Sequence, residues 1–137
     1  MQFDEIIKNL PALFCALFVA ILFIQSGIDK VFDWKGNLGW LTGHFEKTFV
    51  AAMVPMMLGT ILVLELATGL LAAAGIIYFL FTASTVVIFI ASVIGAVALT
   101  ALFFGQRIAK DYAGAAILVP YFLLILAMMY LTLPKLS

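Results

Sequence analysis

A single glutamate, Glu65, interrupts a long apolar stretch of this 137-residue chain. It is flanked by Val-Leu and Leu-Ala and lies several helical turns from any predicted loop. An ionised carboxylate in the middle of a membrane helix costs at least about 2.5 kcal/mol, so such a group either takes up a proton or pairs with a buried donor. Glu65 is therefore our first candidate for a proton or ligand site. The alternative is a structural hydrogen bond that locks two helices together.

Other polar residues form two clusters, each beside an apolar segment. The first follows the first apolar segment and comprises Gln25, Ser26, Asp29, Lys30 and Asp33. The second precedes the last apolar segment and comprises Gln106, Arg107, Lys110 and Asp111. In the first cluster, residues four apart share a helix face, and we expect Gln25 to point inward. Lys30 can extend its ammonium to the membrane surface, so its position is less informative.

Antiparallel helices bring these two clusters to the same face of the membrane. Together they could form a polar vestibule above Glu65 that holds an anionic or quinone-like head group. An ordinary charged membrane rim is the alternative. At the depth of Glu65 we expect Ser92 on the third helix and Tyr121 on the fourth, and both are candidate hydrogen-bond donors to its carboxylate.

The elements that must position these residues are four membrane-spanning helices, because a span needs roughly 20 apolar residues. We place them at about 11–28, 50–72, 76–104 and 112–133. The apolar run across the second and third is too long for one span, and we predict its turn at residues 69–75, GLLAAAG. For residues 29–48 we predict either a short interfacial amphipathic helix with Asn37 as N-cap or an irregular loop tied down by Trp34 and Trp40.

Composition supports this all-α membrane bundle. Hydrophobic residues make up 66% of the chain and charged residues 10%, with a mean hydropathy of +1.27. The net charge is zero, which argues against nucleic acid as a partner. Cys15 is the only cysteine and His44 the only histidine, so neither an intramolecular disulfide nor a transition-metal site is expected. The length predicts a single domain, and the first apolar segment lacks a small-x-small cleavage site, so we expect it to be retained.

The basic residues favour one orientation in the membrane. The first and third loops carry Lys30, Lys35, Lys47, Arg107 and Lys110, whereas Lys8 and Lys135 lie near the termini. The positive-inside rule then predicts cytoplasmic loops and external termini.

Three segments carry a resemblance to the DoxX family of small bacterial four-helix membrane proteins. They are QSGIDKVFDW at the end of the first helix, ELATG in the second and FGQRIAKDYAGAA at the start of the fourth. The resemblance implies a bundle in the bacterial cytoplasmic (inner) membrane, with the termini inside, contrary to the charge count. It also implies, for some members, a role as an oxidoreductase subunit, and one branch is similar to the membrane subunit of a thiosulfate:quinone oxidoreductase. This sequence lacks the cysteine pairs of related redox proteins.

Three functional hypotheses follow. The first is an accessory, non-catalytic subunit of a membrane redox complex linked to quinone, with no covalent cofactor and with a redox protein as partner. The second is a small proton-coupled transporter or lipid-binding protein that uses Glu65. The third is a scaffold or assembly subunit in which Glu65 only fixes helix packing. In each case we expect lipid contact and an oligomer or complex.

Overall fold

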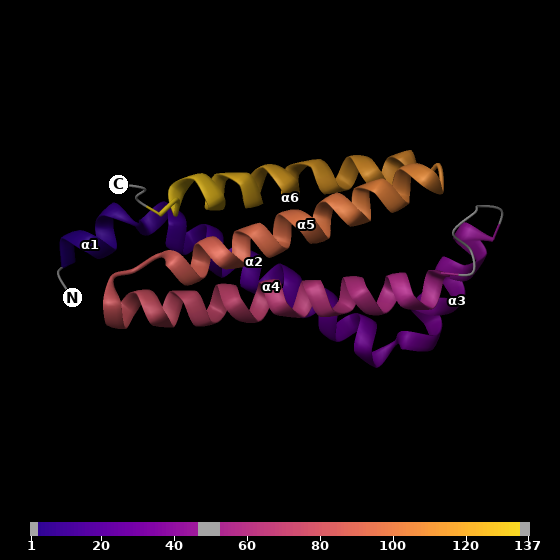
Figure 1. Cartoon of the computed structure of the whole chain (residues 1–137), viewed down its shortest axis with the longest axis horizontal. Coiled ribbons are helices and arrows are strands. Elements are labelled where there is room, and N and C mark those ends of the chain that lie inside the picture. The colour runs from indigo at the N-terminus through magenta and orange to yellow at the C-terminus, as the bar shows by residue number, and fades with distance from the viewer. Residues whose placement is uncertain (1–2, 47–52, 135–137) are drawn as a thin grey trace.

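The computed structural model describes residues 3–46 and 53–134. These residues form six helices in the order α1 (Phe3–Lys8), α2 (Leu10–Phe32), α3 (Trp34–Phe45), α4 (Val54–Thr82), α5 (Val86–Ile108) and α6 (Tyr112–Leu131) (Figure 1). The predicted start of the second spanning helix at residue 50 lies outside the described residues. So do Lys47 and Lys135 of the charge count.

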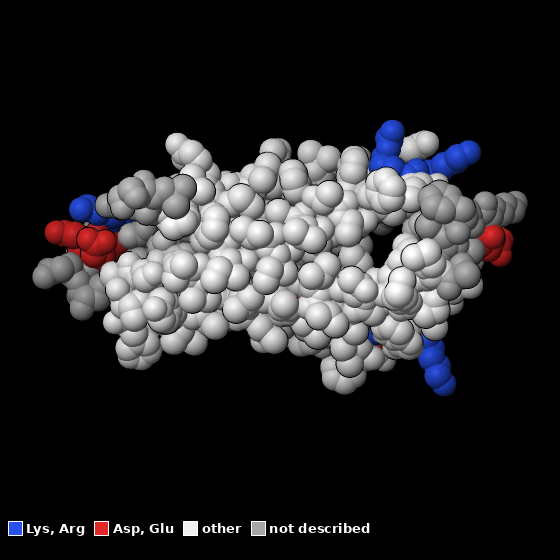
Figure 2. Space-filling view, viewed as in Figure 1, with Lys and Arg blue, Asp and Glu red and all other residues white. Residues whose placement is uncertain are grey.

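Four of these helices, α2, α4, α5 and α6, are long and apolar enough to cross a membrane. They pack as an all-α bundle, which confirms the predicted fold class. On the face shown in Figure 2, the charged side chains lie only at the two ends of the molecule and leave an uncharged belt between them. That distribution is the one a bilayer requires, because an exposed charge in the hydrocarbon region is costly.

Local sequence explains where several helices begin. Pro11 lies in the first turn of α2 and Pro55 in that of α4, where a missing backbone N–H costs nothing. At the start of α6, the Asp111 carboxylate accepts a hydrogen bond from the Gly114 backbone N–H at 3.0 Å and so caps the helix. The short helix between the first two spans is present as α3, but it begins at Trp34. Asn37 is therefore not its N-cap; its amide donates instead to the Asp33 carbonyl.

The predicted turn at residues 69–75 is wrong, because α4 continues through this segment to Thr82. The reversal occurs at Ala83, whose φ of 60° is left-handed and ends the helix. The Thr82 and Ser84 hydroxyls accept hydrogen bonds from backbone N–H groups of this turn. Hydroxyl side chains therefore supply partners that the broken helix no longer provides.

Gly69 and Gly75 instead allow α4 to pack closely against its neighbouring helices. A Cβ at Gly69 would lie 2.8 Å from the backbone nitrogen of Ile24 on α2, and one at Gly75 would lie 2.9 Å from that of Ile88 on α5. Small residues allow such backbone approach in membranes, where lipid gives helices no hydrophobic reason to associate. These glycines thus join α4 to both of its main neighbours.

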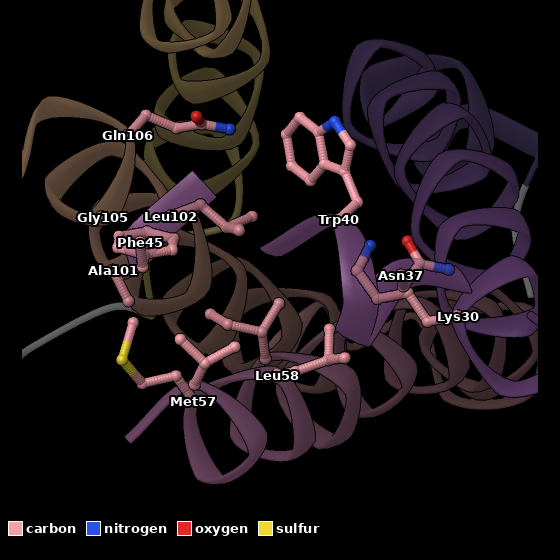
Figure 3. Close-up of a pocket in the computed structure, with 12 residues that line it drawn as sticks. Lys30, Asn37, Trp40, Phe45, Met57, Leu58, Ala101, Leu102, Gly105 and Gln106 are labelled. Atoms are coloured by element: carbon pink, nitrogen blue, oxygen red, sulfur yellow. The ribbon is translucent and has the colours of Figure 1, made fainter. Parts of the chain in front are cut away.

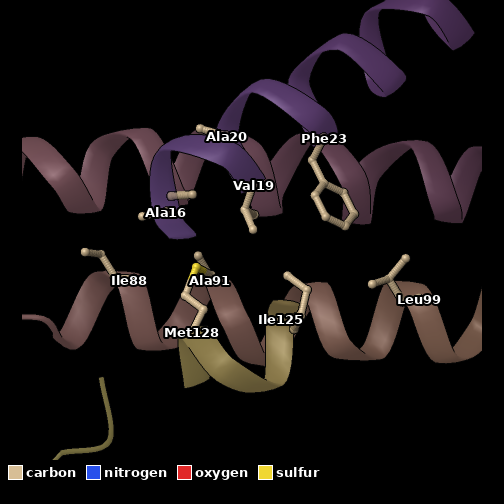
Figure 4. Packing of buried hydrophobic residues seen from close by; sticks show 10 residues of the cluster. Ala16, Val19, Ala20, Phe23, Ile88, Ala91, Leu99, Ile125 and Met128 are labelled. Carbon is tan, nitrogen blue, oxygen red and sulfur yellow. The ribbon is translucent and has the colours of Figure 1, made fainter. Parts of the chain in front are cut away.

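The apolar core lies where α2, α4, α5 and α6 meet (Figure 4). Its fully buried members include Val19 of α2, Ile88 and Ala91 of α5, and Ile125 and Met128 of α6. Helix α1 and the end of α6 lie at one end of the bundle, whereas α3 and the connection from α5 to α6 lie at the other (Figure 1). We call the latter the loop end; the candidate site is found there.

Candidate functional site

Glu65 is joined to Lys30 by an ion pair between α4 and α2. The Lys30 ammonium Nζ lies 3.1 Å from Glu65 Oε1 and donates a hydrogen bond to Oε2 at 3.3 Å. It also donates to the Ser26 hydroxyl, one turn back on α2, at 2.9 Å. The spacing of Ser26 and Lys30 therefore places both on the face of α2 that meets Glu65.

Burial of the pair is strongly asymmetric. The Glu65 side chain is 2% exposed, whereas that of Lys30 is 19% exposed. Glu65 Oε1 lies within ion-pair distance of the ammonium, but among the described residues it accepts no hydrogen bond of good geometry. The carboxylate is thus held deep in the bundle with one cation as its counter-charge, and that cation reaches toward a more open space.

Neither predicted donor occupies this place. The Ser92 hydroxyl donates to the Phe89 carbonyl on its own helix. Tyr121 is half-buried and packs against the apolar core, and no hydrogen bond within the described residues joins it to Glu65. Depth alone selected these two residues, but a shared depth does not fix the direction in which a helix presents a side chain. The long lysine stem instead lets a residue near the helix end reach the buried acid.

The open space beside Lys30 is a cavity of about 200 Å³ at the loop end, between α2, α3, α4 and α5. Its polar lining residues are Lys30, Asn37, Trp40 and Gln106, and Leu58 and Leu102 are among the apolar ones (Figure 3). Figure 2 shows the molecule deeply hollowed toward the same end. The cavity therefore combines a cation and two amides with mostly apolar walls.

Of the predicted vestibule, the structure brings Lys30 and Gln106 together at this cavity. Gln25 is exposed and does not point inward as predicted, because Phe23 and Gly27 occupy the buried face of α2 and a residue between them lies on the opposite side. Asp29 is also exposed, two residues from Gly27. Of the described residues of α2, Lys30 alone lines the cavity.

The remaining members of the second cluster shape the turn before α6. The exposed Arg107 guanidinium lies 4.7 Å from the centre of the Tyr112 ring, a cation–π contact. Lys110 has a φ of 62°, and Asp111 caps α6. Arg107, Lys110 and Asp111 are not among the described residues that line the cavity.

Two lining residues, Asn37 and Trp40, were missed as site residues. From the sequence we expected Asn37 to cap a helix and Trp40 to anchor the segment at the membrane surface. Both lie on α3, which folds back over the bundle and contacts α2 and α4. The surrounding segment, residues 29–48, is polar along much of its length, so the sequence did not single these two residues out. Only the packing of α3 shows that they line the cavity.

The described part of the chain contains no group of three His, Cys, Asp or Glu residues that could hold a metal ion. No family model, curated protein or solved structure matches the chain. Hydropathy and packing alone identify it as a small multi-pass membrane protein whose four candidate spans form one bundle.

Proposed function

We propose that this protein binds a quinone-like head group in the loop-end cavity and serves as an accessory subunit of a quinone-linked membrane redox complex. One observation carries the proposal. The Lys30 ammonium, held inside the bundle by Glu65, faces a cavity whose walls are otherwise mostly apolar. A membrane-soluble molecule with a flat ring and carbonyl acceptors matches this combination.

The hydrogen-bonding capacity of Lys30 supports a carbonyl ligand. An ammonium has three N–H donors. In the described structure two of them are used, one on Ser26 and one on Glu65. The third can donate to a ligand carbonyl, while Leu58 and Leu102 contact the ring. The amides of Asn37 and Gln106, on α3 and α5, also line the cavity and can hydrogen-bond the head group.

Charge favours a neutral head group over an anionic one. Lys30 and Glu65 balance each other at about 3 Å, so the cavity presents a polarised pair rather than a net positive charge. An anion placed against Lys30 would also approach the Glu65 carboxylate, and like charges at short range repel strongly where the surroundings are apolar. A quinone avoids this repulsion.

A bound quinone would supply the oxidation–reduction chemistry, and this chain would bind and orient it. The single cysteine, Cys15, cannot form a dithiol within the chain. Electrons would therefore reach the site from a partner protein. The resemblance of three segments to the DoxX family favours such a role as a subunit.

The proposal can be tested with the two tryptophans, because a quinone quenches a neighbouring indole. Trp40 lines the cavity, whereas the half-buried Trp34 at the same end does not. In nanodiscs, the Trp34→Phe protein, which keeps Trp40, should show saturable quenching by a tailed benzoquinone. The Trp40→Phe protein, which keeps Trp34, should show only the gradual quenching expected of collisions in the bilayer. The same concentration dependence in both proteins would contradict a site at the cavity.

Mass spectrometry of the purified protein provides a second measurement. We expect a quinone to co-purify at a higher ratio to protein than in the surrounding detergent-solubilised lipid. A phospholipid enriched in its place would favour the alternative of a lipid-binding protein.

One observation favours a second candidate, the assembly or scaffold role. The ion pair joins α2 to α4 and so contributes to helix packing as well as to the cavity. If Glu65→Gln changes thermal stability but leaves quinone quenching of Trp40 intact, the pair is structural and this second role gains support.

A further inference from the structure

A cavity of about 200 Å³ leaves no room for the tail of an amphiphile. Sites for whole drug-sized ligands occupy about 300–1,000 Å³. A ring-sized head group therefore fits, and an attached hydrocarbon chain must extend out of the cavity. A chain that ends in the bilayer needs a route on a side of the cavity that adjoins an apolar surface.

The wall between α4 and α5 has a groove on its outer side. This groove, of about 270 Å³, shares four lining residues with the cavity, namely Met57, Ile61, Ala101 and Gly105. Met57 and Ile61 are one turn apart on α4, and Ala101 and Gly105 are one turn apart on α5. These four residues form a seam with the cavity on one side and the groove on the other.

The two helices are farther apart at this seam than at their other end. At Gly75, near the Ala83 turn, an added Cβ would lie 2.9 Å from the backbone of α5. At Gly105, the only described atom within 4 Å of an added Cβ belongs to Phe45 of α3, and none belongs to α4. Figure 1 shows α4 and α5 meeting at the turn and separating toward the loop end.

Side chains rather than backbone therefore fill the seam. The α5 side contributes only a methyl group and a glycine, and the flexible Met57 side chain extends toward Ala101 (Figure 3). Methionine readily changes rotamer and adapts to irregular partners. A change of the Met57 rotamer would therefore widen the seam.

The outer groove has the chemistry of a hydrocarbon site. Met56 and Phe104 are exposed large apolar residues at its edge. Its polar residue, Thr60, donates its hydroxyl to the Met56 carbonyl at 2.9 Å and is satisfied within its own helix. Beyond Phe104, the surface continues along α5 past Val97, toward the middle of the uncharged belt.

We propose that the seam is a lateral opening through which the tail of the bound amphiphile leaves the cavity, so that its head group lies inside and its tail lies in the groove between α4 and α5. This inference rests on the proposed function and specifies its ligand as a molecule with one ring and one hydrocarbon chain. Because lipid is as apolar as the groove, the tail adds little affinity. The opening instead decides which molecules can reach the cavity from the bilayer.

The experiment compares two probes on the Trp34→Phe background in nanodiscs. They are a dimethoxybenzoquinone without a tail and the same ring with a decyl chain, and quenching of Trp40 is the readout. The first seam variant is Thr60→Phe, which covers the seam from the groove side; Thr60 lines the groove but is not among the described residues that line the cavity. Thr60→Leu, a smaller obstruction at the same place, is the second seam variant. Ala127→Phe is the control, because Ala127 is exposed on α6 and lines neither the cavity nor the groove.

We expect at least one seam variant to weaken binding of the decyl probe by about tenfold or more while the tail-less probe changes by less than about twofold; tenfold corresponds to about 1.4 kcal/mol. The control should bind both probes as the background protein does. If both seam variants bind the decyl probe normally, or lose both probes equally, the tail does not pass here, although the proposed function stands. If the background protein binds neither probe, the proposed function itself fails.

Discussion

Removing either partner of the Lys30–Glu65 pair should destabilise the protein, but by unequal amounts. Lys30→Met leaves the carboxylate inside the bundle without its counter-charge. Glu65→Gln leaves the ammonium, which is the more exposed partner and still donates to Ser26. We therefore expect Lys30→Met to be the more destabilising substitution, even though methionine suits a membrane helix better than lysine does.

The magnitudes follow from the burial of each group. Breaking a buried pair by removing one partner costs about 3–5 kcal/mol. With Glu65 only 2% exposed, Lys30→Met should approach about 3 kcal/mol of lost unfolding free energy. Lys30 is 19% exposed, and its flexible stem can turn the ammonium toward water in the cavity, so Glu65→Gln should cost about 1–2 kcal/mol. The double variant removes both charges and should lie within about 1 kcal/mol of the native protein.

Unfolding in detergent by increasing dodecyl sulfate, followed by circular dichroism, measures all four proteins of this cycle. The expected order of stability places Lys30→Met last, with Glu65→Gln between it and the double variant. An equal or larger loss for Glu65→Gln would show that the burial difference does not govern the pair. A double variant as unstable as Lys30→Met would show that the loss comes from packing of the lysine stem.

Each of two further predictions compares a pair of substitutions that should change the free energy of unfolding in opposite directions. Both pairs are measured by the same unfolding assay. Gly69→Ala should destabilise the protein by about 1–3 kcal/mol, because the new methyl meets the Ile24 backbone, which cannot yield. Gly59→Ala should instead stabilise it by about 0.5–1 kcal/mol, because the nearest described atom to the new methyl belongs to Trp34 and lies 3.9 Å away. Ala83→Gly should stabilise by up to about 1 kcal/mol because it relieves a left-handed residue, whereas Ala74→Gly within α4 should cost about 1 kcal/mol. The same sign for both members of either pair would contradict the local geometry.

The four spans were predictable because the thickness of the bilayer requires about 20 consecutive apolar residues in each spanning helix, and such runs are visible in the sequence. The first prediction, 11–28, and the last, 112–133, fall close to α2 and α6. The turn of the long apolar run was not found because glycine serves both in tight turns and in close helix contacts. Sequence alone does not separate these uses. The polar residues around Ala83, namely Thr82, Ser84 and Thr85, were the signal that the glycines obscured.

The site was only partly predictable for a different reason. Glu65 stands out because a single acid in an apolar helix is conspicuous. It can be recognised from the sequence without knowing which residues of other helices lie beside it. Its partner depends on the rotation of α2 about its own axis, which small packing residues such as Gly27 decide. We therefore expected Gln25 to point inward and Lys30 to reach the membrane surface, whereas in the structure Lys30 is the residue that meets Glu65.

The close contacts of α2 with α4 bear on why the pair exists. Gly69 meets the backbone of α2 at Ile24, and Gly27 lies against the Leu66 side chain. Close contacts between α2 and α4 therefore lie directly beside Glu65. These contacts already fix the two helices, and a pair of apolar residues could replace the ion pair at little cost. A role beyond packing is the more economical explanation for two charges at this depth. The double variant Lys30→Met/Glu65→Gln separates the two roles, since it should stay folded yet lose the quinone quenching of Trp40. Retention of that quenching would assign the pair to structure alone.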